Sequence, residues 1–427
     1  MRSLNFIGGE PLAISKVRSR MAAIPIASPR SIGSICEGEP PVPLRARTEG
    51  GVTGQPKVAV LVLNHNGKRW LGRCFGSLER LTYGNLEAYL VDNGSGDGSA
   101  EFVRQRFPWA KVIRFEENLG FAEAYNRAIE AVDAPYVMLL NNDAEVVASE
   151  CIERLVRKIR SGPGMAAVAC KMVQMADRSR IDSVGGMGIP FWRGFVDIGR
   201  GEPDRGQYDG PGFEPFAFCG GAALVDRRAF LMAGGFDGSF FLYAEDVDLS
   251  WRLRLMGYGI GYEPSAKVAH YFSGSSGSKA VDPGKLYYCH RNLLRMIIKN
   301  CGPALGWALR NYLLFSLLMI AGFSAIDPLK ALAVLKAILW NLARLRGSCA
   351  ERASVQAARR RGEGEVLALM YPRLPRHRPP ERPSLRRILD LLFEASQMRR
   401  LERFTKGPVH PSSRAAEGFP RPVPGRP

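Results

Sequence analysis

The stretch "VAVLVLN" (58–64) joins a run of β-branched and aliphatic residues to a polar end. Three later segments repeat this design: "LEAYLVDN" (86–93), "KVIRFEEN" (111–118) and "YVMLLNND" (136–143). Segments with helical spacing lie between them: "KRWLGRCFGSLERL" (68–81), "GSAEFVRQRF" (98–107) and "FAEAYNRAIEAV" (121–132). Strands that alternate with helices in this way predict βαβ units, and therefore an α/β fold with a mostly parallel sheet flanked by helices.

Each predicted strand ends in Asn or Asp. Asn64, Asp92 and Asn118 end the first three strands, and the run 141–143 ends the fourth. One polar strand end is ordinary turn chemistry. In open α/β sheets, however, ligands bind at the carboxyl ends of the strands. Four polar ends along one edge therefore predict a binding crevice.

Composition narrows the classes of partner and chemistry. The 427 residues carry a formal net charge of +18, which indicates an anionic partner: a phosphorylated ligand, a membrane surface or nucleic acid. The eight cysteines form no C-x-x-C pair, which argues against structural zinc and suits reduced thiols in a cytosolic protein. "NGSGDGS" (93–99) lacks the G-x-G-x-x-G spacing of dinucleotide-binding folds, and no P-loop motif is present.

The chain divides by composition into four parts. Residues 1–55 read as a disordered leader without a signal peptide, and 56–300 as the α/β domain. Residues 301–346 are apolar and basic, and they include sixteen uncharged residues, 311–326. We expect helices that lie on or dip into a membrane face; a buried hairpin and a single span are the alternatives. Residues 347–427 are rich in Arg and Pro and read as a mostly disordered tail.

The stretch "FFLYAEDVDLSWRLRLMGYG" (240–259) places three carboxylates among aromatic and aliphatic residues. Asp248 and Arg252 are four apart on a predicted helix and can pair. Asp246 falls in the first helical turn, where the helix dipole favours a negative charge. Capping of the helix N-terminus explains at most one of the two acids Glu245 and Asp246. A rigid, partly desolvated carboxylate is also how a general base is made.

Six ordered motifs over about residues 57–300 resemble the family 2 glycosyltransferases, in particular their rhamnosyltransferase-like branch. The motifs are "VAVLVLNHNG", "VDNGSGDGS", "ENLGFAEAYNRA", "MLLNNDAEV", "GGFDGSFFLYAEDVDLSWRLRLMGYG" and "VAHYFSGSSG". The resemblance implies the GT-A fold for residues 56–300, a nucleoside-diphosphate sugar as donor, and inversion at the anomeric carbon. Asp92 then matches the carboxylate that binds the base. The implied donor-binding residues are Asn64, Asp92, Asn118, Gly120, Asn126, Asn142 and Asp143.

The resemblance also assigns the metal, the base and the acceptor side. Asp143 ends the metal-binding D-x-D motif, here Asn-Asn-Asp, and His270 matches a late histidine that helps hold the metal. A divalent cation, Mg²⁺ or Mn²⁺, offsets the charge of the leaving diphosphate. Asp246 matches the general base. Glu245, Gly220 and Gly221 fall on the acceptor side, and "FSGSSGSK" (272–279) reads as a lid.

The resulting hypothesis is a metal-dependent, inverting sugar transferase. It would sit peripherally at the cytoplasmic face of the inner membrane, with a single span as the alternative. Its donor would be a deoxythymidine or uridine diphosphate sugar, with rhamnose the leading candidate, and its acceptor a lipid-linked or growing cell-envelope glycan. A non-catalytic, membrane-associated scaffold of the same fold is the alternative function. No nucleic-acid partner is expected, because no nucleic-acid-binding motif appears.

Overall fold

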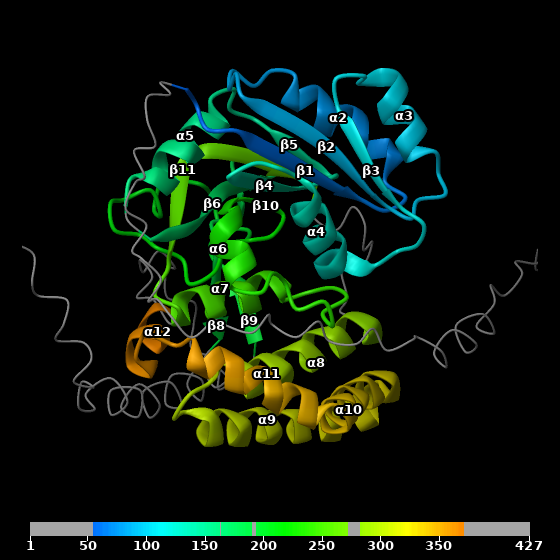
Figure 1. The fold of residues 1–427 in the computed structure, drawn as a ribbon. Coiled ribbons are helices and arrows are strands. Elements are labelled where there is room, and N and C mark those ends of the chain that lie inside the picture. The colour runs from blue at the N-terminus through cyan, green and yellow to red at the C-terminus, as the bar shows by residue number, and fades with distance from the viewer. Residues whose placement is uncertain (1–53, 163, 190–193, 272–281, 371–427) are drawn as a thin grey trace, which may run out of the picture. The chain divides into compact units, whose positions relative to one another are not determined.

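A computed structural model describes residues 54–162, 164–189, 194–271 and 282–370. All of them belong to one compact unit, Val42–Pro427. The predicted leader before residue 54, the predicted lid at 272–279 and the tail after residue 370 lie outside the described residues. The described part combines a nine-stranded sheet with helices on both faces and further helices beneath it (Figure 1).

The N-terminal half follows the predicted alternation. Its elements are β1 (Val58–Asn64), α2 (Lys68–Leu78), β2 (Leu86–Asn93), α3 (Ser99–Arg106), β3 (Lys111–Phe115), α4 (Gly120–Ala131) and β4 (Tyr136–Asn141). The four strands pair in parallel in the order β3-β2-β1-β4. Residues Ala59 and Leu61 pack toward α4, whereas Val58 and Val60 pack toward α2, α3 and α5 (Cys151–Arg160), because successive strand residues point to opposite faces.

The second half makes the sheet mixed. Its strands are β5 (Ala144–Val146), β6 (Met165–Gln174), β7 (Ile181–Ser183), β10 (Ala222–Asp226) and β11 (Gly259–His270), with β8 (Gly186–Ile189) and β9 (Gly194–Asp197) as a separate pair. Strand β10 lies between β4 and β6 and is antiparallel to both. The predicted α/β sheet flanked by helices is confirmed. The sequence patterns did not predict β6, whose residues are almost all buried.

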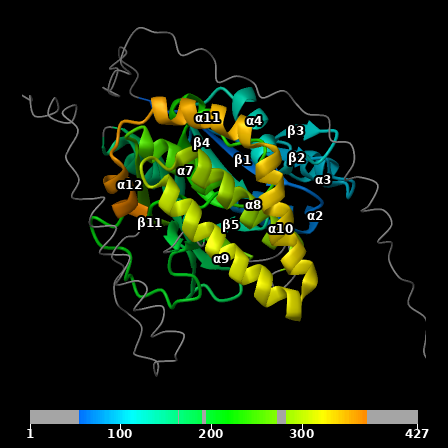
Figure 2. The same cartoon turned by 90° about the horizontal axis from the view of Figure 1, so that it is seen from below.

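Five helices follow the sheet and lie beneath it, beside α7 (Glu245–Leu255) (Figures 1 and 2). They are α8 (Pro283–Asn300), α9 (Leu305–Ile326), α10 (Pro328–Ala343), α11 (Leu345–Ala357) and α12 (Glu363–Met370). Helix α8 packs against α7, α9, α10 and α11. Helices α11 and α12 occupy the beginning of the predicted tail, so that part of the chain is helical.

Helix α9 is longer than the uncharged run in the sequence. It begins at Leu305 and has 22 residues, because the helix continues through Arg310 toward its N-terminus. It is the one helix among the described residues that is long and apolar enough to cross a membrane, and only 17% of its most apolar window is buried. Both a span and a helix lying on a membrane surface satisfy these criteria.

A buried cluster of charges joins α8 to α7 and to the loop before it. Lys299 forms ion pairs with Asp237 and with Asp248, the latter at 3.3 Å, and Arg295 pairs with Asp237 at 2.7 Å. Asp248 also pairs with Arg252 at 2.9 Å, as the spacing predicted. Burial opposes ionisation of Asp237, but the two cations outweigh it and hold its pKa well below the usual range. The cluster fixes α7 against α8.

We predict that Lys299→Met destabilises the protein by about 3–5 kcal/mol, because it removes the buried cation that Asp237 and Asp248 share and leaves each of them with a single arginine. Urea unfolding followed by circular dichroism measures the change. Arg127→Met, which breaks the exposed pair with Glu123, is the matched control and should cost no more than about 1 kcal/mol. Equal effects of the two substitutions would contradict the structural role of the cluster.

Candidate active site

The carboxyl ends of β1, β2 and β4 lie side by side at one edge of the sheet. The parallel register pairs Asn64 with Asp92, and β4 pairs with β1 on its other side. Asn64 Oδ1 accepts a 2.6 Å hydrogen bond from Asn142 Nδ2, and Asn64 Nδ2 donates to Ser95 Oγ at 3.1 Å. The structure therefore brings together predicted residues from three separate strand ends.

Asp92 is a buried carboxylate that accepts no hydrogen bond from the part of the chain that the structure describes. It is fully buried, and neither of its oxygens has a hydrogen-bond partner among the described residues. Arg114 Nε lies 3.5 Å from Asp92 Oδ2 and supplies a positive charge. Leaving a buried acceptor unsatisfied is unfavourable. The arrangement suits a ligand that donates hydrogen bonds to this carboxylate.

A turn after β3 connects this edge to the loop before α7. Asn118 Oδ1 accepts hydrogen bonds from Asn93 Nδ2 at 3.0 Å and from the Gly120 N–H at 2.9 Å. Gly120 has φ +81°, and a Cβ there would lie 2.5 Å from Phe241 O. The neighbouring Phe121 N–H donates to that same oxygen at 2.8 Å. Only glycine permits this approach of the two segments.

Asn126 bonds to the loop before α7. Its Nδ2 donates to Phe236 O at 2.9 Å, and its Oδ1 accepts from the Phe236 N–H at 2.8 Å. Both polar groups of the side chain are thus engaged by one backbone residue. Asn126, which the resemblance places among the donor-binding residues, holds the loop that precedes α7 through these two bonds.

His270, at the end of β11, links two carboxylates. Its Nδ1 lies 2.7 Å from Asp182 Oδ2, and its Nε2 lies 3.2 Å from Asp143 Oδ1. Burial lowers the pKa of His270, but the hydrogen bonds to Asp143 and Asp182 outweigh this effect and raise it to about 9. At neutral pH the ring is therefore a cation held between two acids.

The same three residues fit a divalent cation shared with a ligand. Asp182 fixes the ring through Nδ1, which is how an outer carboxylate orients a metal-binding histidine. His270 Nε2 and an Asp143 oxygen then face the same point, where a metal would replace the proton. Among the described residues, no cluster of three His, Cys, Asp or Glu side chains could hold a metal by itself. Mg²⁺ and related ions commonly take one or two protein ligands plus phosphate oxygens.

The start of α7 is a strained turn held from α8. Tyr243 and Ala244 have φ values of 71° and 67°, which is the left-handed region that residues with a side chain seldom adopt. Asn292, on α8, donates through Nδ2 to Leu242 O at 3.0 Å and to Tyr243 O at 2.7 Å. These bonds stabilise the turn, and the two acids that begin α7 follow it directly.

Asp246 faces the segment before β10. Its Oδ2 accepts a 2.8 Å hydrogen bond from the Gly220 N–H, and its Oδ1 accepts one of 2.8 Å from the Val247 N–H. Burial, with a further contribution from the Asp197 charge, raises the pKa of Asp246 to about 6. A Cβ on Gly220 would lie 3.0 Å from the Phe121 ring and 3.4 Å from Asp246 Oδ2, so glycine allows this close contact.

Glu245 and Gly221 lie beside this contact. Glu245 is 5% exposed, and its Oε2 has no hydrogen-bond partner within the described part of the chain. Burial raises the pKa of Glu245 well above its usual value, and the charge of Asp246 adds to the effect. Gly221 accepts a 2.9 Å hydrogen bond from the Asn141 N–H, and a Cβ there would meet the Met172 methyl at 3.0 Å.

Sequence reasoning missed three residues that shape the site. Asp182 orients His270, Asn292 holds the turn before α7, and Asp197 adds negative charge near Asp246. Asp197 itself accepts a 2.8 Å hydrogen bond from Ser183 Oγ. Asp182 and Asp197 lie on strands of three and four residues, which have no turn or helix pattern to mark them. Asn292 lies on α8, and only its tertiary contact with the turn before α7 reveals its role.

The sequence is similar to a known protein family and to several characterised proteins. The family model "Glycosyl transferase family 2" matches residues 59–230. The chain is 30% identical over 271 residues to an N-acetylglucosaminyl-diphospho-decaprenol L-rhamnosyltransferase of Mycobacterium tuberculosis, covering 57% of this chain and 86% of that protein. It is 25% identical over 268 residues to the O-antigen biosynthesis protein RfbC of Myxococcus xanthus, covering 58% of this chain and 20% of the relative.

Solved structures give looser matches. The mannosyltransferase PcManGT from Pyrobaculum calidifontis, in complex with GDP-Man and Mn²⁺, aligns with a TM-score of 0.43 and 20% identity over 72% of this chain and 86% of that one. TarS 1–349 of S. aureus aligns with a TM-score of 0.44 and 16% identity over 71% and 90%. Such scores are too low to transfer a site. The match over most of the mycobacterial relative, together with the family model, shows that the chain belongs to glycosyltransferase family 2 and is rhamnosyltransferase-like.

Proposed function

We propose that the protein transfers a sugar from a nucleoside-diphosphate sugar to a lipid-linked or growing cell-envelope glycan, with inversion at the anomeric carbon. The observation that supports this most is the placement of Asp246. It begins a helix, is held by two backbone N–H groups, and has a pKa raised to about 6. Such a carboxylate is ionised at neutral pH yet basic enough to take a proton from a hydroxyl in the transition state.

The donor half of the proposed site is the sheet edge. The unsatisfied Asp92 carboxylate would accept hydrogen bonds from the base of the nucleotide. Asn64 and Asn142, which already bond each other, would line the adjacent ribose and phosphates. Asn118 and Gly120 shape the turn beside them. In this proposal Asn126 acts indirectly, by holding the loop before α7.

Asp143 and His270 would hold a divalent cation, Mg²⁺ or Mn²⁺, at the diphosphate. When bound, the cation would offset the negative charge that develops on the leaving diphosphate. Asp182 would keep the imidazole in the orientation that leaves Nε2 available. In this proposal Asp143 and His270 bind the metal and the diphosphate, whereas Asp246 contacts the acceptor.

The transfer would be a single displacement. The acceptor oxygen forms the new bond to the anomeric carbon while the bond to the diphosphate oxygen breaks, and the hydroxyl proton passes to Asp246. Burial raises the pKa of Glu245, and the protonated carboxyl could donate a hydrogen bond to the acceptor. Gly220 and Gly221 would let the acceptor or the diphosphate approach the backbone closely. Attack from the opposite face of the sugar gives inversion.

The donor sugar and the acceptor are proposed from the family. The relative from M. tuberculosis is a rhamnosyltransferase that acts on a decaprenol-linked substrate, by its name. Rhamnose, carried as a deoxythymidine or uridine diphosphate sugar, is accordingly our leading proposal. We also propose 56–300 as the transferase domain and 301–346 as the membrane-associated region. The scaffold alternative would retain the fold without binding a donor.

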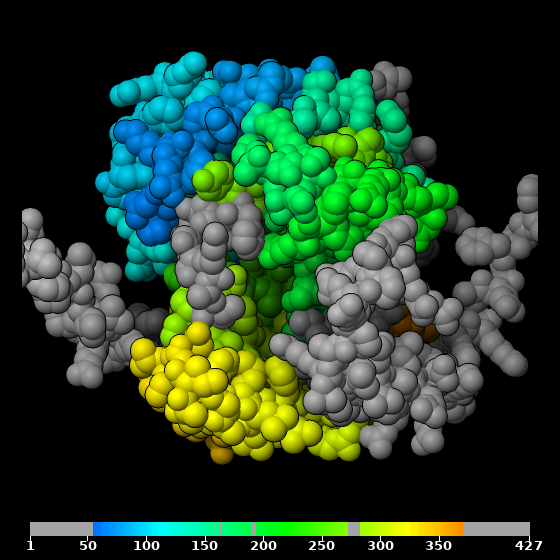
Figure 3. Space-filling model, turned by 180° about the vertical axis from the view of Figure 1, so that it is seen from behind, coloured from blue at the N-terminus to red at the C-terminus, as the bar shows by residue number. Residues whose placement is uncertain are grey.

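The helices α9 and α10 would bring the protein to its lipid-linked acceptor. The exposed large hydrophobic residues include a set on these helices and just beyond: Leu313, Leu314, Leu317, Leu318, Ile326, Leu329, Leu332, Leu335, Leu339, Leu342 and Leu345. The surface is hollowed between the sheet and these helices, drawn in yellow (Figure 3). We propose that the apolar face formed by these exposed side chains of α9 and α10 lies on the cytoplasmic surface of the inner membrane, as peripheral helices do.

Ligand-induced thermal shift tests the proposal. Wild type, Asp143→Ala and Asp246→Asn are heated with a panel of nucleotide sugars, with and without Mn²⁺ or Mg²⁺. We expect one donor to stabilise the wild type with metal, Asp143→Ala to lose the metal-dependent part, and Asp246→Asn to keep it. No stabilisation by any donor would favour the scaffold alternative.

We predict that kcat/KM rises with pH through about 6 and levels above it, because Asp246 accepts a proton only when ionised. Asp246→Asn should lower kcat by roughly 10²–10⁴-fold and abolish this pH step, while the donor Kd changes little. Steady-state rates from pH 5 to 8 measure both. An Asp246→Asn enzyme that keeps wild-type kcat would exclude Asp246 as the base.

We predict that Asp92→Asn weakens binding of the free nucleoside diphosphate by roughly tenfold or more, since a charged acceptor is lost. Its thermal stability should equal or exceed that of the wild type, because an unsatisfied buried carboxylate is removed. Isothermal titration calorimetry gives the Kd. Glu101→Gln, which changes an exposed partner of Arg114, is the control and should leave the Kd within about twofold. Unchanged binding in Asp92→Asn would contradict the base-binding role.

We predict that the double substitution Leu317→Ser and Leu329→Ser lowers the partition coefficient onto lipid vesicles by roughly tenfold or more, because two apolar side chains no longer enter the bilayer. Both residues are more than 60% exposed, so the folded state should be unaffected. Vesicle co-sedimentation measures the effect. Met232→Ser, at an exposed residue on α6 (Arg227–Met232), should bind like the wild type. Identical binding by all variants would show that this face does not contact lipid.

A further inference from the structure

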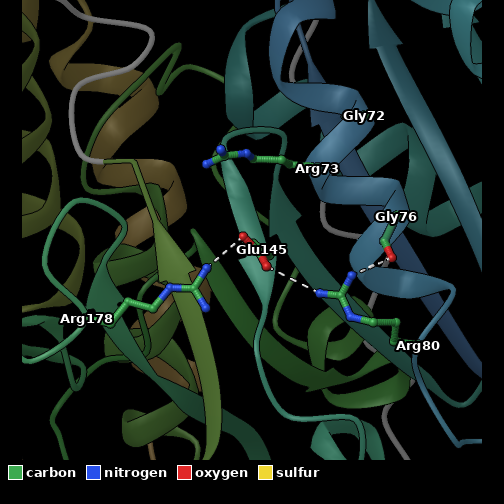
Figure 4. A pocket seen from close by; sticks show the side chains of 6 residues that line it. All are labelled: Gly72, Arg73, Gly76, Arg80, Glu145 and Arg178. Atoms are coloured by element: carbon green, nitrogen blue, oxygen red, sulfur yellow. Dashed lines mark hydrogen bonds and ion pairs between the residues drawn. The ribbon is translucent and has the colours of Figure 1, made fainter.

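A cavity of about 450 Å³ opens between α2, β5 and the segment after β6. Its volume lies within the range of small-molecule sites in proteins. Figure 4 shows the side chains around it. The lining residues are Gly72, Arg73, Gly76, Arg80, Glu145 and Arg178. None of these residues was assigned a role in the sugar transfer proposed above.

The charges around the cavity do not balance. Glu145 binds two of the three arginines, Arg80 at 3.3 Å and Arg178 at 2.9 Å. The guanidinium of Arg73 makes no hydrogen bond or ion pair with the residues that the structure describes. Three cations against one carboxylate leave an excess of two positive charges. Glu145 separates Arg80 and Arg178 but does not neutralise the pocket.

Two glycines belong to the lining of the cavity. Gly72 and Gly76 are one turn apart on α2. A Cβ at Gly76 would meet nothing within 4 Å, and at Gly72 it would meet only the Phe102 ring, at 3.8 Å. Neither position needs glycine for its backbone or its packing, and glycine weakens a helix interior. Glycine therefore leaves the lining of the cavity without a side chain at these two positions.

We propose that this pocket binds a phosphate- or diphosphate-bearing ligand, at a site separate from Asp92 and Asp246. Guanidinium groups match the oxygens of phosphate with paired, charge-assisted hydrogen bonds. In Figure 4, Arg80 and Arg178 approach Glu145 from opposite sides, and Arg73 extends from α2 above it. Glu145 follows Asp143 by two residues, so the pocket adjoins the edge of the sheet that carries the proposed metal site. The phosphate could belong to a soluble diphosphate or to a lipid headgroup, which have the same recognition chemistry.

The first arm of the test measures binding of inorganic diphosphate to the full chain by calorimetry. It is done in EDTA, so that no metal site contributes, and it is independent of the proposed transferase activity. The variants are Arg73→Ala, which removes one cation, and Gly76→Leu, which adds a large side chain at a lining residue. Arg157→Ala, at an exposed arginine on α5, is the control for the loss of one charge elsewhere. Circular dichroism checks that Gly76→Leu keeps the helix.

The second arm measures co-sedimentation with phosphatidylglycerol vesicles, using phosphatidylcholine vesicles as the neutral comparison. We expect Arg73→Ala and Gly76→Leu to weaken binding of diphosphate or of phosphatidylglycerol vesicles by roughly tenfold or more. Arg157→Ala should bind both as the wild type does. Loss confined to diphosphate identifies a soluble ligand, and loss confined to phosphatidylglycerol identifies a lipid headgroup. If neither variant differs from Arg157→Ala in either arm, the proposal is overturned.

Discussion

The hold of α8 on the start of α7 is the constraint on which the rest of the site depends. Two consecutive residues, Tyr243 and Ala244, adopt left-handed backbone conformations, which cost on the order of 1–3 kcal/mol each. Asn292 offsets this cost with two hydrogen bonds to the turn, and Lys299 anchors α7 through Asp248. Because α8 also packs against α9 and α10, one helix connects the acidic residues of the site to the apolar face. A lipid-anchored acceptor would need this connection.

Much of the fold could be predicted from the sequence, because its N-terminal half has strong local patterns. The bounds of β1 and β2 agree with the predicted runs to the residue, since each run is bounded by polar turn residues. Strand β6 was missed, because a run such as "MAAVACKMVQ" reads equally well as a buried helix. The insertion of β10 between β4 and β6, antiparallel to both, is set by contacts distant in sequence, which no local pattern encodes.

The site was predictable where residues follow strands or begin a helix. Asp92, Asn142 and Asp246 lie at such positions, and the family motifs mark them. Asp182 and Asp197 could not be found this way, because they act through space on His270 and Asp246 from short strands far along the chain. Asn126 illustrates the reverse case: its position fits the motif, but tertiary contacts with Phe236 use both of its polar groups. The roles of Asp182, Asp197 and Asn126 therefore follow from their tertiary contacts and not from their spacing in the sequence.

The turn held by Asn292 would keep Asp246 in the buried position that raises its pKa, and a titration of the aspartate carboxyl carbons by NMR tests this claim without any substrate. The full-length protein, labelled with ¹³C-aspartate, is titrated as wild type, Asp246→Asn and Asn292→Leu. The account predicts a wild-type carboxyl that titrates at about 6, is absent in Asp246→Asn and is displaced in Asn292→Leu. The account would be contradicted by a wild-type spectrum without such a carboxyl, or by an Asn292→Leu titration identical to the wild type.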